Sequence, residues 1–254
     1  MASSSKVIVI TGASGGIGRA CAIALSEAFP SVVLVLSGRK EVELKTTSEA
    51  CRAGTVTEIC AGDASKEADV EAMFRLVRSK YGRVDLLFNN AGVDLLNSVP
   101  IEDADMAVFR QVLDINIMAS VLCTKEAVKL MKEQHPQGGR IINNGSISAT
   151  SPRPNSAAYT ISKHAIHGLS KSTSLDGRKY GITCTQLDIG NAQTAMGGHA
   201  AKGCTQSDGS TKTEPMMPVA NVAKTIVFLA GLEAAADVLS LELIASGMPF
   251  VGRG

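Results

Sequence analysis

The sequence predicts a single α/β domain, a doubly wound parallel sheet of about seven strands with helices on both faces. Three observations carry this prediction. Short runs of Val, Ile and Leu alternate with longer helical patterns along all 254 residues, which is typical of successive βαβ units. No repeat or linker divides the chain. Aromatic residues make up only 4% of the composition, so the core rests on aliphatic side chains, as in buried parallel strands.

The expected elements alternate from one end of the chain to the other. Strands are expected at Lys6–Ile10, Val32–Leu36, Val56–Cys60, Val84–Phe88, Arg140–Asn143, Thr183–Leu187 and Leu239–Ile244. Helices are expected at Ile17–Phe29, Glu41–Ala53, Glu67–Tyr81, Asp103–Gln134, Ala157–Tyr180 and Val219–Leu232. We therefore expect right-handed βαβ crossovers and a ligand site at the carboxyl edge of the sheet.

One segment breaks this alternation. Gly197–Pro218 reads GGHAAKGCTQSDGSTKTEPMMP, which is long for a structureless loop in a compact domain. Its position after the sixth strand, at a carboxyl end, favours a substrate lid over a bound ligand. A passive disordered insertion is the alternative.

The composition excludes several classes of partner. The net charge is +1 with no long charge run, so neither a nucleic acid nor an acidic membrane is expected as a partner. The six cysteines are far apart and the four histidines form no ligand set, which favours a reducing compartment and no metal. The N-terminal MASSSK precedes no long apolar run, so we expect no signal peptide and a cytoplasmic protein.

A glycine-rich turn follows the first expected strand. In VIVITGASGGIGRA the glycines are at positions 12, 15, 16 and 18, and a helix begins near Ile17. Glycine lets the backbone approach a ligand closely, and the helix start directs free N–H groups at a pyrophosphate. The alternative is a turn that only packs the strand on the helix. The position between first strand and first helix favours nucleotide binding.

The spacing Thr-Gly-x-x-x-Gly-x-Gly is not the commoner G-x-G-x-x-G fingerprint and resembles the short-chain dehydrogenase/reductase family. This resemblance implies that Asp63, in GDAS, holds the adenine amino group and that Asn90, in NNAG, supports the sheet beneath the cofactor. Each also has a structural alternative, as a helix N-terminal residue and as a buried turn amide. The implied cofactor-binding residues are Gly12, Ser14, Gly16, Ile17, Gly18, Ser37, Arg39, Asp63, Asn90, Gly92, Tyr159, Lys163, Gly190 and Thr194.

The stretch YTISK places Lys163 one helical turn after Tyr159. An ammonium group on the same helix face stabilises phenolate and is expected to lower the tyrosine pKa toward a useful range for proton transfer. Ser146 lies 159 − 146 = 13 residues before the tyrosine, a spacing that resembles the family's, and Asn116 matches its helix-embedded asparagine. The resemblance implies that Ser146 orients the substrate oxygen and that Asn116 holds a water linking Lys163 to solvent. An exposed helix pair is the alternative for Tyr159 and Lys163.

Two stretches depart from the family pattern. In LDIGNAQTAM, Ile189 stands where a proline is usual, while Gly190 and Thr194 keep their places. The chain also ends in LIASGMPFVGRG without the usual Asp-Gly-Gly. These departures affect the expected shape of the substrate pocket and the subunit contact. Polar loop residues that could line that pocket are Asp94, Ser148, Arg153 and Asn155.

The second strand ends in VVLVLSGRK, which bears on cofactor choice. Gly38 stands where enzymes that prefer NAD(H) place an acid for the ribose 2′-hydroxyl. Arg39 can instead bind a 2′-phosphate, with Ser37 adding a neutral hydrogen bond. The alternative is that Arg39 and Lys40 are solvated residues opening the next helix. We expect NADP(H) to be favoured over NAD(H).

Together these residues predict an NADP(H)-dependent oxidoreductase that transfers hydride between nicotinamide and a ketone or secondary alcohol, with Tyr159 as general acid/base. The resemblance also implies a homotetramer or homodimer formed through the long helices near 103–134 and 157–180. The alternative is a dinucleotide sensor or scaffold of the same fold, since fold does not establish function. The complete Asn-Ser-Tyr-Lys set favours the enzyme.

Overall fold

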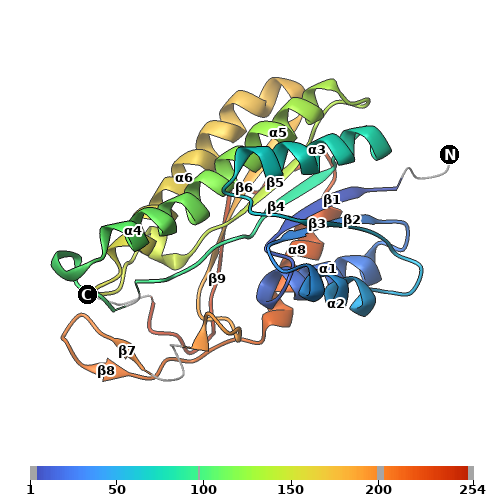
Figure 1. Ribbon diagram of the computed structural model, residues 1–254. Coiled ribbons are helices and arrows are strands. Elements are labelled where there is room, and N and C mark those ends of the chain that lie inside the picture. The colour runs from blue at the N-terminus through green and yellow to red at the C-terminus, as the bar shows by residue number, and fades with distance from the viewer. Residues whose placement is uncertain (1–4, 97, 199–202, 251–254) are drawn as a thin grey trace.

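A sheet of seven strands forms the centre of the molecule (Figure 1) in the order β3-β2-β1-β4-β5-β6-β9. The computed structural model describes residues 5–96, 98–198 and 203–250. All neighbouring strands of this sheet are parallel, which confirms the predicted fold class. The strands are β1 Val7–Thr11, β2 Val33–Gly38, β3 Val56–Ala61, β4 Leu86–Asn89, β5 Gly139–Asn144, β6 Ile182–Ile189 and β9 Ser240–Leu243.

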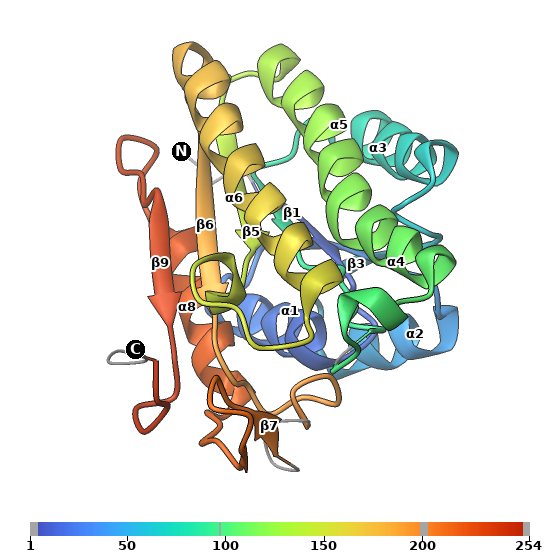
Figure 2. The same ribbon diagram turned by 90° about the vertical axis from the view of Figure 1, so that its left-hand side faces the viewer.

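Helices cover both faces of the sheet, as the two perpendicular views show (Figures 1 and 2). One face carries α1, α2 and α8, and the other carries α3, α4, α5 and α6. The helices are α1 Gly16–Ala28, α2 Glu41–Ala50, α3 Glu67–Tyr81, α4 Met106–Leu113, α5 Ala119–Glu133, α6 Ala157–Gly177 and α8 Val219–Gly231.

The central strands are apolar on both sides because both sides are covered. Along β1, Val7 and Val9 belong to a core cluster with α3 and α5, whereas Ile8 and Ile10 belong to a cluster with α1 and α8. Side chains of a strand alternate between the two faces. A continuous run of β-branched residues is therefore what this position in the sheet requires.

The single helix expected over Asp103–Gln134 is wrong in detail. A 3₁₀ turn at Ile101–Asp103 precedes α4, and a π-helical segment at Asp114–Met118 separates α4 from α5. The Asp105 carboxylate caps α4 by accepting from the Ala107 N–H at 2.7 Å. Wide π turns occur often at functional sites, and this one contains Asn116.

The stretch 106–133 is also long and apolar enough to cross a membrane by length and composition alone. Its inward residues, including Cys123, Ala127, Leu130 and Met131, are buried in the core between α3 and the sheet. These residues form the buried stripe of a helix that covers one face of the sheet.

The segment after β6 is ordered by backbone pairing where the structure describes it. An antiparallel hairpin joins β7 Cys204–Thr205 to β8 Thr211–Lys212. The segment returns to its start through a bridge between Ala192 and Met217, where the Gln193 N–H donates to the Met217 carbonyl at 2.9 Å. The expected lid is therefore no structureless loop over its described part; its residues 199–202 lie outside the described residues.

Candidate active site

A cavity of about 700 Å³ follows the carboxyl edge of the sheet. It is lined by the turns that leave β1, β2, β3, β4, β5 and β6. Strands β1 and β4 are neighbours there, and the chain turns away from them in opposite directions along the sheet. Such a switch point is where open α/β sheets bind ligands.

The glycine-rich turn forms one wall of this cavity. Gly12 has a φ of +65°, in the left-handed region, and a Cβ on Gly18 would lie 2.3 Å from the Gly12 carbonyl oxygen. Only glycine fits at both positions. Helix α1 begins at Gly16 without a side-chain cap on its first N–H groups. These N–H groups and the helix dipole suit an anionic ligand such as a phosphate.

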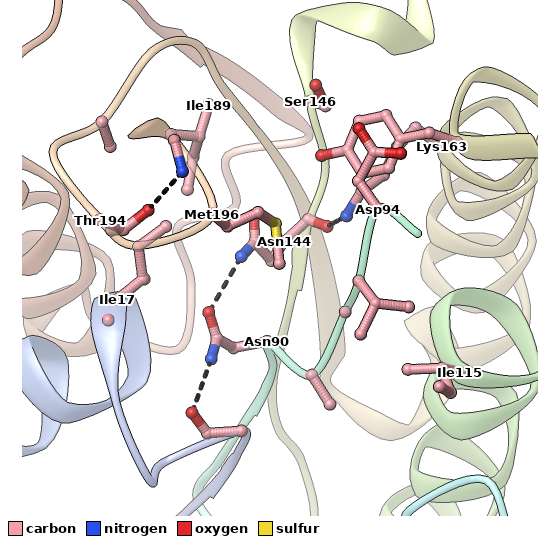
Figure 3. A pocket seen from close by; sticks show the side chains of 18 of the residues that line it. Ile17, Asn90, Asp94, Ile115, Asn144, Ser146, Lys163, Ile189, Thr194 and Met196 are labelled. Carbon is pink, nitrogen blue, oxygen red and sulfur yellow. Dashed lines mark hydrogen bonds between the residues drawn. The ribbon is translucent and has the colours of Figure 1, made fainter. Parts of the chain in front are cut away.

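Asn90 ties this turn to the neighbouring strands. Its side-chain nitrogen donates to the Thr11 carbonyl at 2.9 Å. Its oxygen accepts from the Asn144 side chain at 2.9 Å (Figure 3). Asn144 ends β5, so one carboxamide links the ends of β1 and β5. The role of Asn90 as a support of the sheet beneath a cofactor stays a prediction.

The far end of the cavity carries the groups expected to choose between cofactors. Ser37, Gly38, Arg39 and Lys40 all line it. Lys40 also lies 3.6 Å from the Glu43 carboxylate. A Cβ on Gly38 would meet the Ser14 hydroxyl at 3.3 Å, so this position has little room for a larger side chain.

Asp63 lines the same end and holds its own turn together. Its Oδ1 accepts from the Ser65 N–H at 3.0 Å and from the Ser65 hydroxyl at 2.8 Å. Burial raises the pKa of Asp63, but these hydrogen bonds and the charge of Arg39 hold it below its usual value. The carboxylate is thus ionised at neutral pH and faces a cation.

Ser146, Tyr159 and Lys163 line the opposite end of the cavity. Lys163 is 5% exposed; its Nζ donates to the Asn144 carbonyl at 2.7 Å and lies 5.4 Å from the centroid of the Tyr159 ring. The Ser146 N–H donates to Asp188 Oδ1 at 2.8 Å. A Cβ on Gly145 would lie 2.1 Å from that same oxygen, so only glycine allows Asp188 to approach this closely.

The pKa values of the pair differ from the sequence-based expectation. Burial raises the pKa of Tyr159 to about 12, although a hydrogen bond with Ser146 lowers it. Burial lowers the pKa of Lys163 to about 8, while the charge of Asp188 raises it. The expected lowering of the tyrosine pKa is therefore wrong for this structure, because removal from water disfavours both charged forms. At neutral pH Tyr159 is a neutral phenol, the form that donates a proton.

Asn116 lies behind this end and does not line the cavity. Its carboxamide accepts from the Val93 N–H at 2.8 Å and donates to the Val93 carbonyl at 2.9 Å and the Ser162 hydroxyl at 3.0 Å. Asn116 thereby joins the loop after β4 to α6. The expected water contact is untested, and Asn116 Oδ1 has remaining acceptor capacity.

Most of the predicted site residues come together. Of the residues expected to bind cofactor or substrate, all except Gly18 and Asn116 line the cavity. Asp94, Ser148 and Arg153 also line it, whereas Asn155 is not among its lining residues. Asp188 is a site residue that the sequence did not predict, although an acid directly after the expected strand Thr183–Leu187 lies at the carboxyl edge, where ligands bind.

A buried ion pair connects the wall of the cavity to the segment after β6. The Arg153 Nη2 lies 2.6 Å from the Glu214 carboxylate, whose side chain is 1% exposed. Asn191 contacts both, accepting from Arg153 at 2.9 Å and donating to Glu214 at 2.9 Å. Gln206 donates to the other Glu214 oxygen at 3.1 Å. The hairpin segment is thus fastened to the loop that precedes α6.

Within the part of the chain that the structure describes, no group of three or more His, Cys, Asp or Glu side chains could hold a metal ion.

Comparisons with known proteins agree with this geometry. The family model described as short chain dehydrogenase matches residues 6–204. A 3beta-hydroxysteroid dehydrogenase of Mediterraneibacter gnavus is 37% identical over 192 residues, which cover 75% of this chain and 67% of the relative. Levodione reductase of Leifsonia aquatica is 30% identical over 197 residues, covering 75% and 71%.

Solved structures of similar shape include a point variant of actinorhodin polyketide ketoreductase with NADPH. Its TM-score is 0.83 at 25% identity, covering 96% of this chain and 98% of that one. Acetoin dehydrogenase of Salmonella typhimurium gives a TM-score of 0.78 at 26% identity, covering 94% and 95%.

Proposed function

The chain belongs to the short-chain dehydrogenase family of oxidoreductases, and we propose that it interconverts ketones and secondary alcohols with NADP(H). One observation supports this most strongly. Ser146, Tyr159 and Lys163 meet at one end of a cavity whose other end is formed by the glycine turn and the start of α1. A group able to move a proton thus faces the same space as a phosphate-binding turn.

The residues present fit a nicotinamide dinucleotide. The turn keeps its tight shape because a Cβ on Gly12 or Gly18 would clash with neighbouring protein atoms, and α1 directs its positive end at the cavity that Gly12 lines. When bound, the nicotinamide supplies or accepts the hydride at the carbonyl carbon. The binding surface would be formed by Gly12, Ser14, Gly16, Ile17, Asn90, Gly92, Gly190 and Thr194. Gly18 would contribute indirectly, by letting α1 pack against Gly12.

Tyr159 is the proposed general acid in the reductive direction. Its phenol gives the proton that the developing alkoxide needs, and takes it back in oxidation. Ser146 would hold the substrate oxygen beside that phenol. Lys163, predominantly protonated at neutral pH with a pKa of about 8, would stabilise the phenolate as it forms. Asn116 would position the loop after β4 and hold a water toward Lys163.

The preference for NADP(H) rests on the end of β2. Gly38 offers no carboxylate to the ribose 2′-hydroxyl, and Arg39 and Lys40 line the cavity beside it. A 2′-phosphate there would meet two cations and the Ser37 hydroxyl. Asp63 is the proposed adenine partner.

The segment Gly197–Pro218 is the proposed lid. Its described residues Gly197, Cys204 and Thr205 line the cavity, and Glu214 fastens it to Arg153. Closing such a lid would exclude water from the reacting groups.

We also propose a cytoplasmic homodimer or homotetramer. The spacing of the cysteines supports a reducing compartment. Ile161 and Leu175, exposed by 47% and 65%, lie 14 residues apart on α6 and so share nearly one side of it. Gly168 lies midway, where an added Cβ would meet nothing within 4 Å, so a second helix can approach there.

A panel of ketones and alcohols assayed with NADP(H) and NAD(H), following the absorbance of the reduced nicotinamide, tests this function. We expect turnover of at least one ketone with NADPH. A protein that binds the cofactor tightly yet turns over no member of a broad panel would instead be a sensor or scaffold.

A further inference from the structure

Asp94 occupies the reacting end of the cavity. It lines that cavity two residues after Gly92, and its side chain points toward the side where Ser146 and Lys163 lie (Figure 3). Its negative charge also contributes to the raised pKa of Tyr159, after burial, which is the largest cause. A carboxylate at this end of the cavity would face the groups that a substrate carries near its carbonyl.

The backbone under Asp94 is held firmly. Both the N–H and the carbonyl of the preceding residue, Val93, bond to the Asn116 carboxamide, at 2.8 and 2.9 Å. That carboxamide is itself bonded to Ser162 on α6, the helix that carries Tyr159 and Lys163. The backbone next to Asp94 is therefore linked to α6 through Asn116, and a site that selects among substrates needs such support.

Both cations at this end are already engaged by protein groups. Arg153 contacts Glu214 at 2.6 Å and Asn191 at 2.9 Å, and Lys163 donates to the Asn144 carbonyl. Among the described residues that line the cavity, the only other acid is Asp63, at the far end. A substrate carboxylate near the reacting carbon would be repelled by Asp94. The Arg153 guanidinium would offset this repulsion little, because Glu214 already neutralises it.

Apolar side chains also line this end of the cavity. Val93, Ile115, Ile147 and Met196 line the same cavity. A hydrocarbon body therefore fits beside the single carboxylate.

We propose that Asp94 is a specificity-determining residue. It accepts a hydrogen bond from a hydroxyl or ammonium group that the substrate carries near its reacting carbonyl, and it disfavours substrates with a carboxylate there. This inference rests on the proposed function, because it names the substrate class of the same site. It predicts hydroxy-ketones and amino-ketones, or the matching alcohols, as preferred over keto acids.

Four ketones on one skeleton test it, with methyl, hydroxyl, ammonium or carboxylate placed two carbons from the carbonyl. We expect kcat/KM of the native protein to be higher for the hydroxyl and ammonium ketones than for the methyl ketone by roughly tenfold to a hundredfold, the range for a hydrogen bond to a charged group. The carboxylate ketone should be the poorest. In Asp94→Asn the ratio of ammonium to carboxylate ketone should fall at least about tenfold.

The control is Asp176→Asn, which removes an exposed carboxylate near the end of α6 and should keep the native ratios. Equal kcat/KM for the ammonium and carboxylate ketones in the native protein would overturn the role of Asp94 while leaving the oxidoreductase activity standing. An unchanged ratio in a folded Asp94→Asn protein would do the same. Absence of turnover for all four ketones and their alcohols, with either cofactor, would count against the proposed function itself.

Discussion

Lys163 keeps an ammonium group where water has little access. Its exposed fraction is 5%, and its partners are one backbone carbonyl and the more distant charge of Asp188. The cost of burying this charge explains the lowered pKa. The same cost makes the stability of the protein depend on pH in a specific direction.

The folded-state pKa of Lys163 is about 8, against 10.5 for an ordinary lysine. Between these values the unfolded chain binds a proton that the folded protein has released, so the contribution of Lys163 to the free energy of unfolding rises with pH. Relative to Lys163→Met, the native protein should gain on the order of 2–3 kcal/mol between about pH 7 and pH 10. Urea unfolding of both proteins across this range measures the difference.

A matched control is Lys171→Met, since Lys171 is an exposed lysine on the same helix. The difference in free energy of unfolding between Lys171→Met and the native protein should not change between about pH 7 and pH 10. The comparison stops near pH 10 because the raised pKa of Tyr159, about 12, makes stability fall above that point. If the difference in free energy of unfolding between Lys163→Met and the native protein were also independent of pH, burial would not destabilise the charged form of Lys163.

Arg39 is the residue on which cofactor preference depends. We expect a higher kcat/KM with NADPH than with NADH, and reversal of this order in Arg39→Asp. Each lost charge-assisted contact should cost about 1.5–3 kcal/mol, or roughly tenfold or more in discrimination. Arg75→Asp makes the same charge change on exposed α3 and should leave the order intact. Native efficiency with NADH equal to that with NADPH would refute the reading of Arg39.

Some residues of the site could be predicted from local sequence patterns, and others could not. Ser146, Tyr159 and Lys163 were predictable because they lie within one short stretch of chain. The glycine-rich turn was predictable for the same reason. Asp188 and Glu214 act through contacts with distant segments; Glu214 meets Arg153 across 61 positions of sequence. The pKa of Tyr159 also depends on burial, which one helical turn of sequence does not contain.

Among the elements, the hairpin segment after β6 differs most from its sequence pattern. Its Gly, Ser and Thr content indicates a loop, yet buried Glu214 holds it through Arg153, Asn191 and Gln206. The π-helical turn at Asp114–Met118 could not be predicted either, because its residues continue the apolar pattern of an ordinary helix. In both places tertiary contacts decide the local conformation.

Fastening by Glu214 should control how often the segment opens. Glu214→Gln leaves the Arg153 charge without its carboxylate, so trypsin should cut after exposed Lys212 roughly tenfold faster, for a loss of about 1–2 kcal/mol. Glu242→Gln, on the exposed side of β9, is the control.

Saturating cofactor and substrate should slow cutting of the native protein. Unchanged cutting with both ligands would favour a passive insertion over a lid.

At the scale of the whole molecule, the alternating pattern of strands and helices was sufficient to predict the sheet. Strands buried on both faces need aliphatic runs, and helices on both sides supply the cover. The same pattern does not predict which outer surface forms a subunit contact. On that surface, Ile161, Gly168 and Leu175 lie along one side of α6.

A subunit contact at this side of α6 predicts a specific response. Sedimentation equilibrium of the native protein should give a dimer or tetramer mass. Leu175→Glu places a charge in the contact and should shift the mass toward the monomer by at least one halving. Val42→Glu adds the same charge at an apolar position of α2 that is 73% exposed, away from α6, and is the control. A native protein that sediments as a monomer at micromolar concentration would rule out the contact.

The central claim is that the Tyr159 hydroxyl transfers the proton during carbonyl reduction. Tyr159→Phe removes that hydroxyl and keeps the ring that lies 5.4 Å from Lys163 Nζ. General acid–base catalysis of this kind is worth ~10²–10⁴-fold. The decisive measurement is kcat of Tyr159→Phe on a ketone that the native protein reduces, with the dissociation constant of NADPH measured alongside. We predict that kcat falls by that factor while the dissociation constant changes little; near-native kcat in the variant would contradict the account.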